Sequence, residues 1–219
     1  MDNNADCNGL TLSRRRLIAG AAFGLVCGCG RALAAPAGAE ANPVEVKPQV
    51  LKPGQPLRFD PSLVEADFWE RPRMLDLVRI QTAERVRVVY WVDGEVLDDA
   101  YQQLCHLLRD VRVNRSARMD PALLDTLWAS QAFVARFGIE RPLEVLSAYR
   151  TVSTNRKVGG AEGSLHTRGR AVDYRIPGLR PSQLAQLVRG FRTGGVGFYG
   201  RRSGGWVHAD TGDPRSWRG

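Results

Sequence analysis

The sequence predicts an α+β fold in which a small, mainly antiparallel sheet carries the functional site and packs against helices. Amphipathic helical segments come early in the chain, and short β-type segments come mostly later. The two kinds do not alternate strictly, as they would in a parallel α/β protein. The 219 residues, 43% hydrophobic and 25% charged, suit one soluble domain with an appended segment.

Residues 1–34 are predicted to be an export signal of the twin-arginine type, which would place the protein in the periplasm. Three arginines at 14–16 precede an apolar run at 17–26, and the small residues of an A-x-A site follow at 32–34. The apolar run is too short for a permanent membrane span. A lipoprotein anchored at Cys29 is the alternative, although Cys27 stands where the lipoprotein box prefers a small or hydroxylated residue.

Residues 35–61 are rich in Pro, Gly and Ala and are predicted to form an extended linker, so residues 62–219 make up the folded domain. Without the signal, 27 basic and 21 acidic residues remain, a net charge of +6. In an exported protein this charge favours an anionic cell-wall polymer over nucleic acid. Cys105 is the one cysteine beyond residue 34, which excludes an internal disulfide.

The first predicted element of the domain is a β-hairpin over residues 73–97. Apolar and polar residues alternate on both sides of a central Thr-Ala-Glu, with Val86, Val88 and Tyr90 on one face and a turn at Asp93-Gly94.

Three helices and four further strands are predicted after the hairpin. Apolar residues recur at helical spacing in 98–111, 119–138 and 180–191, and Asp120 followed by Pro121 marks the start of the second helix. Short segments rich in β-branched or aromatic residues, separated by turns, predict strands at 143–150, 170–176, 194–199 and 205–211.

One aspartate interrupts the strand at 170–176. Alternation places Asp173 on the face opposite Val172, Tyr174 and Ile176. His166 lies in the preceding loop, where a glycine lets the chain fold back over the strand. The imidazole and the carboxylate are therefore expected to meet.

A second such pair lies on the strand at 205–211, where His208 and Asp210 share a face. Two imidazoles and one carboxylate with an open fourth position suit a hydrolytic zinc ion, and the other carboxylate could take a proton. The spacing equally allows two unrelated histidines beside ordinary aspartates. His106, on an apolar helix, has a structural role in this interpretation.

Four segments, "SAYRTVSTN", "SLHTRGRAVDYRIPG", "GGVGFY" and "WVHADTG", together resemble the YcbK-like murein endopeptidases. These form a branch of the zinc D,D-peptidase group that includes D-Ala-D-Ala carboxypeptidases. The similarity runs from about residue 73 to 217. The hallmark S-x-H-x-x-G-x-A-x-D is matched by Ser164, His166, Gly169, Ala171 and Asp173.

The resemblance implies a role for each site residue. His166, Asp173 and His208 would hold Zn²⁺, and Arg150 would hydrogen-bond the substrate near the scissile carbonyl and stabilise an oxyanion. Several relatives place a general base three residues before the last histidine, where this chain has Gly205.

Asp210 is the nearest remaining carboxylate, so we expect it to act as the base. The alternative is that Asp210 orients His208 through its other ring nitrogen. Ser164, Tyr149 and Trp206 are candidates for contacts with the substrate.

The implied function is a zinc-dependent peptidoglycan hydrolase, D,D-endopeptidase-like, that cleaves stem-peptide cross-links and meets the export machinery only in transit. A D,D-carboxypeptidase at the same site and a non-catalytic wall-binding module are the alternatives. A serine or cysteine hydrolase is disfavoured because Cys105 lies on an apolar helix face and the chain has no G-x-S-x-G elbow.

Overall fold

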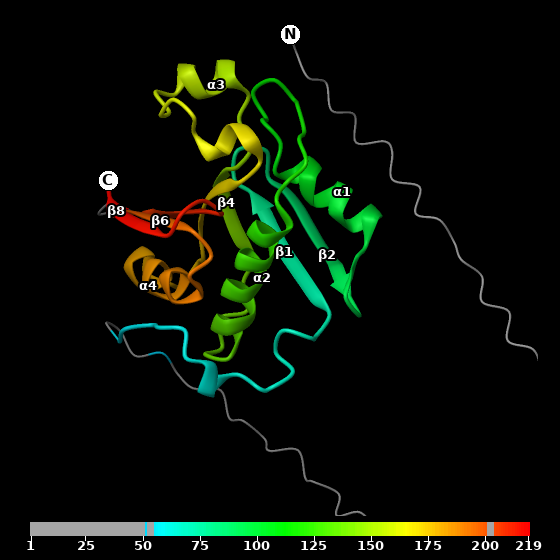
Figure 1. The fold of residues 1–219 in the computed structure, drawn as a ribbon, viewed down its shortest axis with the longest axis vertical. Helices are drawn as coiled ribbons and strands as arrows, with labels where there is room; N and C mark the ends of the chain where they lie inside the picture. Colours follow the sequence, from blue (N-terminus) through cyan, green and yellow to red (C-terminus); the bar gives the residue numbers. More distant parts are fainter. Residues whose placement is uncertain (1–50, 52–54, 201–203) are drawn as a thin grey trace, which may run out of the picture. The chain divides into compact units, whose positions relative to one another are not determined.

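The computed structural model describes residues 51, 55–200 and 204–219 (Figure 1). The predicted export signal, the alternative anchor Cys29 and most of the predicted linker lie outside the described residues. Residues 55–61, the described end of the predicted linker, pack on the domain: Leu57 is buried, and the ring of Phe59 lies 5.5 Å from that of Phe133 and 5.1 Å from that of Phe191. None of the described helices has the length and apolar character needed to cross a bilayer.

The strands form one eight-stranded sheet in the order β3-β2-β1-β4-β5-β7-β6-β8. Their bounds are β1 Arg73–Arg79, β2 Glu84–Val92, β3 Glu95–Val96, β4 Leu143–Ser147, β5 Ala171–Arg175, β6 Gly195–Tyr199, β7 Trp206–Asp210 and β8 Arg215–Arg218. Only the pairs β1/β4 and β6/β8 are parallel. The α+β class and the mainly antiparallel pairing are confirmed, but the sheet is larger than predicted, and β8 was not predicted.

The helices are α1 (Asp98–Leu107), α2 (Pro121–Ala135), α3 (Val152–Lys157) and α4 (Pro181–Phe191). The three predicted helices are present, and α3 is additional. Asp120 caps α2 by accepting a hydrogen bond from the backbone N–H of Ala122 at 3.0 Å, and Pro121 supplies a first residue that has no N–H to satisfy.

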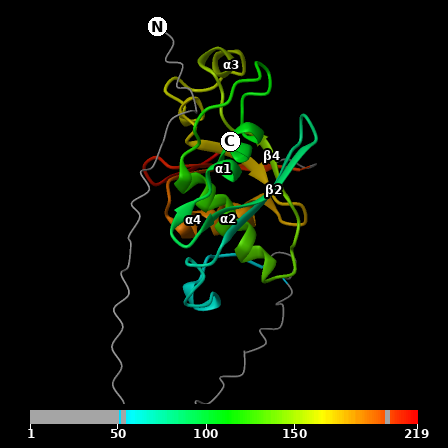
Figure 2. The ribbon, with the colours of Figure 1, turned by 90° about the vertical axis from the view of Figure 1, so that its right-hand side faces the viewer.

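Figure 1 shows α1 beside β2, α2 across the middle of the sheet and α4 beside β6. Both ribbon views place α3 at one end of the domain (Figure 2). The core forms between the sheet and the helices. One contact across it joins β5 to α2: the hydroxyl of Tyr174 lies 2.9 Å from that of Ser130.

Strand alternation decides where the polar residues of β5 and β7 point. Val172 and Tyr174 of β5 and Val207 and Ala209 of β7 are buried in the core. Asp173 and His208 lie between these positions, so their side chains project from the opposite face of the sheet. One face of the sheet therefore makes the core, and the other is available for a site.

Candidate metal centre

Two of the three predicted ligands face each other across neighbouring strands. Asp173 of β5 is paired in register with His208 of β7. The third, His166, lies in a single 3₁₀ turn, Leu165–Arg168, just before β5. Its backbone carbonyl accepts a hydrogen bond from the N–H of Arg150 at 3.1 Å, which fixes the turn against the end of β4.

Gly169 ends this turn and allows it to lie close to the neighbouring chain. Its φ is +67°, in the left-handed region, and a Cβ at this position would lie 2.2 Å from the carbonyl oxygen of Arg118. Its own carbonyl accepts a hydrogen bond from the N–H of Asp120 at 2.9 Å. Both the backbone conformation and the space at this point therefore require glycine.

The free nitrogens of the two histidines converge on one carboxylate oxygen. Nε2 of His166 lies 3.2 Å from Nδ1 of His208 and 3.4 Å from Oδ1 of Asp173. Nδ1 of His208 lies 2.9 Å from the same oxygen. A tetrahedral zinc ion with ligands at about 2.1 Å holds its donor atoms about 3.4 Å apart.

The other nitrogen of each ring is already engaged. Nδ1 of His166 donates to the backbone carbonyl of Ala148 at 2.7 Å, and Nε2 of His208 donates to Oδ2 of Asp210 at 3.0 Å. In these tautomers the two inner nitrogens present lone pairs beside a carboxylate oxygen, a set that either protons or a metal ion can bridge. The arrangement therefore fits a zinc ion.

The protonation of the site follows from burial and from these contacts. Burial lowers the pKa of His166. Burial also opposes protonation of His208, but hydrogen bonds with Asp173 and Asp210 outweigh it and raise the pKa of that ring. Burial acts to raise the pKa of Asp173, but its hydrogen bonds with the two histidines hold that pKa well below the usual range, so the carboxylate is ionised and ready to bind a cation.

Asp210 is a buried carboxylate with five hydrogen-bond donors. Besides His208, the backbone N–H groups of Gly195 and Gly212 donate to Oδ1 at 3.0 and 2.9 Å. Arg215 donates to Oδ1 at 3.2 Å and to Oδ2 at 2.7 Å. A base needs a free lone pair that faces the substrate, so these contacts favour the orienting role over the proton-accepting role.

Arg150 reaches the metal centre through the second oxygen of a predicted ligand. Its Nη2 donates to Oδ2 of Asp173 at 3.1 Å, while Nε donates to Ser147 at 3.0 Å and Nη1 to Asn155 at 3.2 Å. The guanidinium is thus fixed from three sides. Because five N–H groups serve three bonds, two remain for another partner.

The three predicted ligands line a cavity of about 570 Å³, hereafter the metal cavity. Two of the three residues expected to contact substrate, Ser164 and Trp206, also line it. The third, Tyr149, is not among the described residues that line this cavity, and its ring packs against the core. Tyr199, also in the wall, stacks on Trp206 with ring centroids 5.0 Å apart.

The sequence interpretation did not find two residues of β8 that support the site. Arg215 forms an ion pair with Asp210, and the ring of Trp217 lies 5.2 Å from that of His208. Gly197 leaves room for Trp217, because a Cβ there would lie 2.6 Å from its indole ring. The only sequence signal for these contacts is the glycine pattern of β6, which by itself also suits turns and bulges.

Comparisons with known proteins identify the family of the chain. A model of a family of M15 peptidases, described as peptidoglycan L,D-endopeptidase MepK, matches residues 68–217. The chain is 34% identical over 152 residues to the peptidoglycan L,D-endopeptidase MepK of Escherichia coli (strain K12), a match covering 67% of this chain and 81% of that protein.

A second relative is the probable peptidoglycan L,D-endopeptidase MepK of Haemophilus influenzae, 32% identical over 154 residues, which are 68% of this chain and 81% of that protein. The resemblance to YcbK-like murein endopeptidases is thereby confirmed. The chain is a peptidase that belongs to the peptidoglycan L,D-endopeptidase MepK family.

Proposed function

We propose that the chain is an exported, zinc-dependent peptidoglycan hydrolase that cleaves peptide cross-links of the cell wall. The observation that carries the proposal is the convergence of His166, Asp173 and His208, with donor atoms 2.9 to 3.4 Å apart, in the wall of an open cavity. The relatives are named for peptidoglycan, which supplies the substrate class. Action on peptidoglycan also suits the predicted periplasmic location.

The zinc ion would polarise the scissile carbonyl and lower the pKa of a water molecule. The chain's own residues then have positioning roles. The carbonyl of Ala148 fixes the tautomer of His166, and Asp210 fixes that of His208. We assign Asp210 to this role because its lone pairs are occupied by five donors.

Arg150 holds Asp173 in place and retains N–H groups for the substrate. With Nη2 bonded to Oδ2 of Asp173, the guanidinium lies beside the ligand set and lines the same cavity. A cation at this point suits the negative charge that develops on the scissile carbonyl oxygen. The proposal keeps the predicted oxyanion role of Arg150 and adds the orientation of a ligand.

The proposal also specifies the stereochemistry of the peptide bond that is cleaved. The sequence resemblance suggested a D,D-endopeptidase, whereas the relatives are named L,D-endopeptidases. We propose the L,D cross-link as the substrate because the comparison extends over most of the domain. A D,D cross-link and the trimming of a terminal D-residue are the alternatives.

Digestion of purified cross-linked muropeptides tests the proposal. The zinc-loaded protein is incubated with dimers joined through an L,D bond, dimers joined through a D,D bond and pentapeptide monomers, with and without a chelator. We expect only the L,D dimers to fall to monomers, and the chelator to stop the reaction. Cleavage of the D,D dimers alone, or shortening of the pentapeptides by one residue, would establish an alternative specificity.

His166→Ala is the matched control, because it removes one proposed ligand whose side chain is buried, so the surface of the domain stays the same. A wild-type protein that binds the wall polymer, holds no zinc and cuts none of these substrates would be a binding module, and the proposed hydrolase function would then be wrong.

A further inference from the structure

A second cavity, of about 500 Å³, adjoins the metal cavity and is hereafter called the arginine cavity. Asp173 and Arg150 line both cavities. Two more arginines, Arg79 at the end of β1 and Arg112 after α1, line the arginine cavity alone. A group of the substrate that entered this cavity would therefore lie next to the metal centre.

Arg79 is buried without a partner for its charge. Its residue surface is 4% exposed, and its Nε and Nη1 atoms lack any hydrogen-bond acceptor in the described structure. Burial, together with the neighbouring Arg109, lowers the pKa of Arg79 to about 10, so the side chain is still charged at neutral pH. An unpaired buried cation destabilises a fold, which suggests that the partner is a ligand.

The carboxylates around Arg79 already accept hydrogen bonds from other residues. Glu84 pairs with Arg79 in the β1/β2 register, but its carboxylate accepts from Arg109 at 2.9 and 3.0 Å. Asp110 accepts from the N–H and the hydroxyl of Thr151 at 2.9 and 2.8 Å. Asp173 is bonded to Arg150 and belongs to the ligand set.

The rest of the cavity wall strengthens the positive charge. Arg112 is exposed, and its guanidinium makes no hydrogen bond or ion pair with any described residue. Gln81 and Thr82, in the turn between β1 and β2, add polar groups to the wall. Apart from Asp173, no acidic residue of the described chain lines the cavity, so an anionic group would find cations and hydrogen-bond donors there.

We propose that the arginine cavity binds a carboxylate of the substrate peptide close to the scissile bond, with Arg79 as its main partner. The inference rests on the proposed peptidase function of the adjoining metal cavity. A guanidinium binds a carboxylate through charge-assisted hydrogen bonds, and burial strengthens such a pair. The carboxylate comes either from the C-terminus of the stem peptide or from an acidic side chain.

The kinetic test uses three versions of one cross-linked peptide: unmodified, amidated at the C-terminal carboxylate, and amidated at the side-chain carboxylate. We expect one amidation to lower kcat/KM of the wild-type protein about 10- to 100-fold. Arg79→Met should cause a loss of the same size on the unmodified peptide and little further loss on that amide. The amide that shows this pattern identifies the source of the carboxylate.

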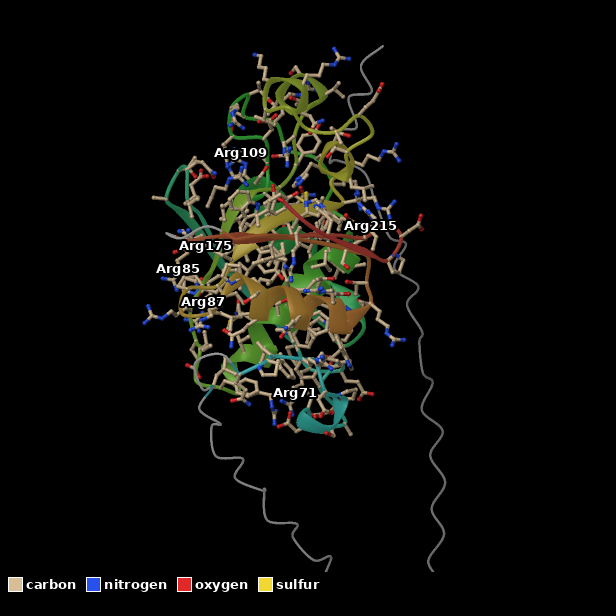
Figure 3. The ribbon with its side chains drawn as sticks, turned by 90° about the vertical axis from the view of Figure 1, so that its left-hand side faces the viewer. Arg71, Arg85, Arg87, Arg109, Arg175 and Arg215 are labelled. Carbon is tan, nitrogen blue, oxygen red and sulfur yellow. The ribbon has the colours of Figure 1, made fainter. Side chains whose placement is uncertain are left out.

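The matched control is Arg87→Met, which removes the same charge from an exposed position of β2. Figure 3 shows Arg87 well separated from Arg109, the neighbour of Arg79. The control should keep the discrimination of the wild-type protein. Equal cleavage of all three peptides by the wild type, or an equal loss with Arg79→Met on all three, would overturn the inference.

A binding measurement separates this inference from the proposed catalytic function. N-acetyl-D-glutamate serves as a probe that no hydrolysis consumes. It should shift the amide signals of Thr82 and Val111 in the wild-type protein and not in Arg79→Met. If the probe binds in this way while no peptide is cut, the hydrolase proposal fails and the carboxylate site stands; if cleavage occurs and the probe leaves these signals unchanged, the carboxylate site is wrong.

Thermal unfolding tests whether Arg79 has a merely structural role. Methionine has a similar length and removes an uncompensated buried charge, so Arg79→Met should unfold at the same temperature as the wild type or higher. If Arg79 binds the substrate, Arg79→Met is therefore at least as stable as the wild type but less active. A clear loss of stability, with no change in discrimination among the three peptides, would assign Arg79 to the fold instead.

Discussion

Oδ2 of Asp210 lies 3.0 Å from Nε2 of His208, on the side of the ring that faces away from Asp173. This contact determines which nitrogen of His208 is free to bind a cation. It also occupies a lone pair of Asp210, the carboxylate that the sequence analysis expects to act as the general base. The same hydrogen bond therefore bears on two questions: which nitrogen of His208 faces the proposed metal, and whether Asp210 can act as a general base.

Replacing Asp210 by Asn tests this assignment. Because the amide oxygen can still accept from His208 but carries no charge, we expect the affinity for zinc to fall about 10- to 100-fold. Turnover at saturating zinc should stay close to that of the wild type. Chelator competition measures the affinity, and kcat is measured with zinc content determined in the same sample.

Asp213→Asn is the control, since it neutralises an exposed carboxylate three residues along the chain. A base role for Asp210 predicts a different outcome, a loss of kcat of about 10²- to 10⁴-fold with zinc fully bound. That outcome would restore the base assignment.

Arg150→Met should lower kcat/KM about 10²- to 10³-fold, the usual loss when an oxyanion donor is removed. Arg150→Lys should not restore activity, because an ammonium group cannot serve Ser147, Asn155 and Asp173 in the planar geometry of the guanidinium. Steady-state kinetics at saturating zinc measure both variants. The control Arg156→Met removes an exposed arginine of α3, and a similar loss there would indicate a general effect of charge.

The histidines provide a test that depends on pH. In the zinc-free protein, burial lowers the pKa of His166, whereas hydrogen bonds with Asp173 and Asp210 raise that of His208 despite its burial. NMR titration should therefore show one ring that protonates below pH 6.5 and one above it. Adding zinc should suppress both titrations, because the metal and the proton compete for the same nitrogens.

The chain has three histidines, so in the variant His106→Gln the two remaining signals come from the two site histidines. As the pH falls through the raised pKa of His208, the affinity for zinc should decrease. If both site histidines keep titrating in the presence of saturating zinc, they are not the ligands, and the proposed metal site is wrong.

The sequence predicted most of the sheet because its strands obey simple alternation. Buried β5 and β7 each present apolar residues to the core, and this pattern alone placed Asp173 and His208 on the opposite face. The hairpin and the long helices were equally marked by turn residues, periodicity and the cap at Asp120. Local signals of this kind are independent of the rest of the fold.

Contacts between distant segments could not be predicted in this way. The short helix α3 is mostly polar, and its cap at Thr151 depends on a hydrogen bond to Asp110, 41 residues away. The strand β8 has four residues and one apolar side chain, Trp217. The donors that occupy Asp210 come from three segments, so the contacts that favour an orienting role for it could not be predicted from the sequence.

Gly169→Ala should destabilise the protein through two separable effects. A left-handed φ of +67° is strained for alanine, and the new Cβ would lie 2.2 Å from the carbonyl oxygen of Arg118, so the turn that carries His166 must move. Gly138→Ala is a matched control, since its φ is +74° and a Cβ there meets nothing within 4 Å. The control should lose about 1 kcal/mol of unfolding free energy, and Gly169→Ala should lose at least about 2 kcal/mol.

Denaturant unfolding of the zinc-free proteins measures this difference. Only Gly169→Ala should also weaken zinc binding, because only that turn positions a proposed ligand. Equal losses in the two variants, with unchanged zinc affinity, would show that close packing of the turn on Arg118 is not what holds His166 in place.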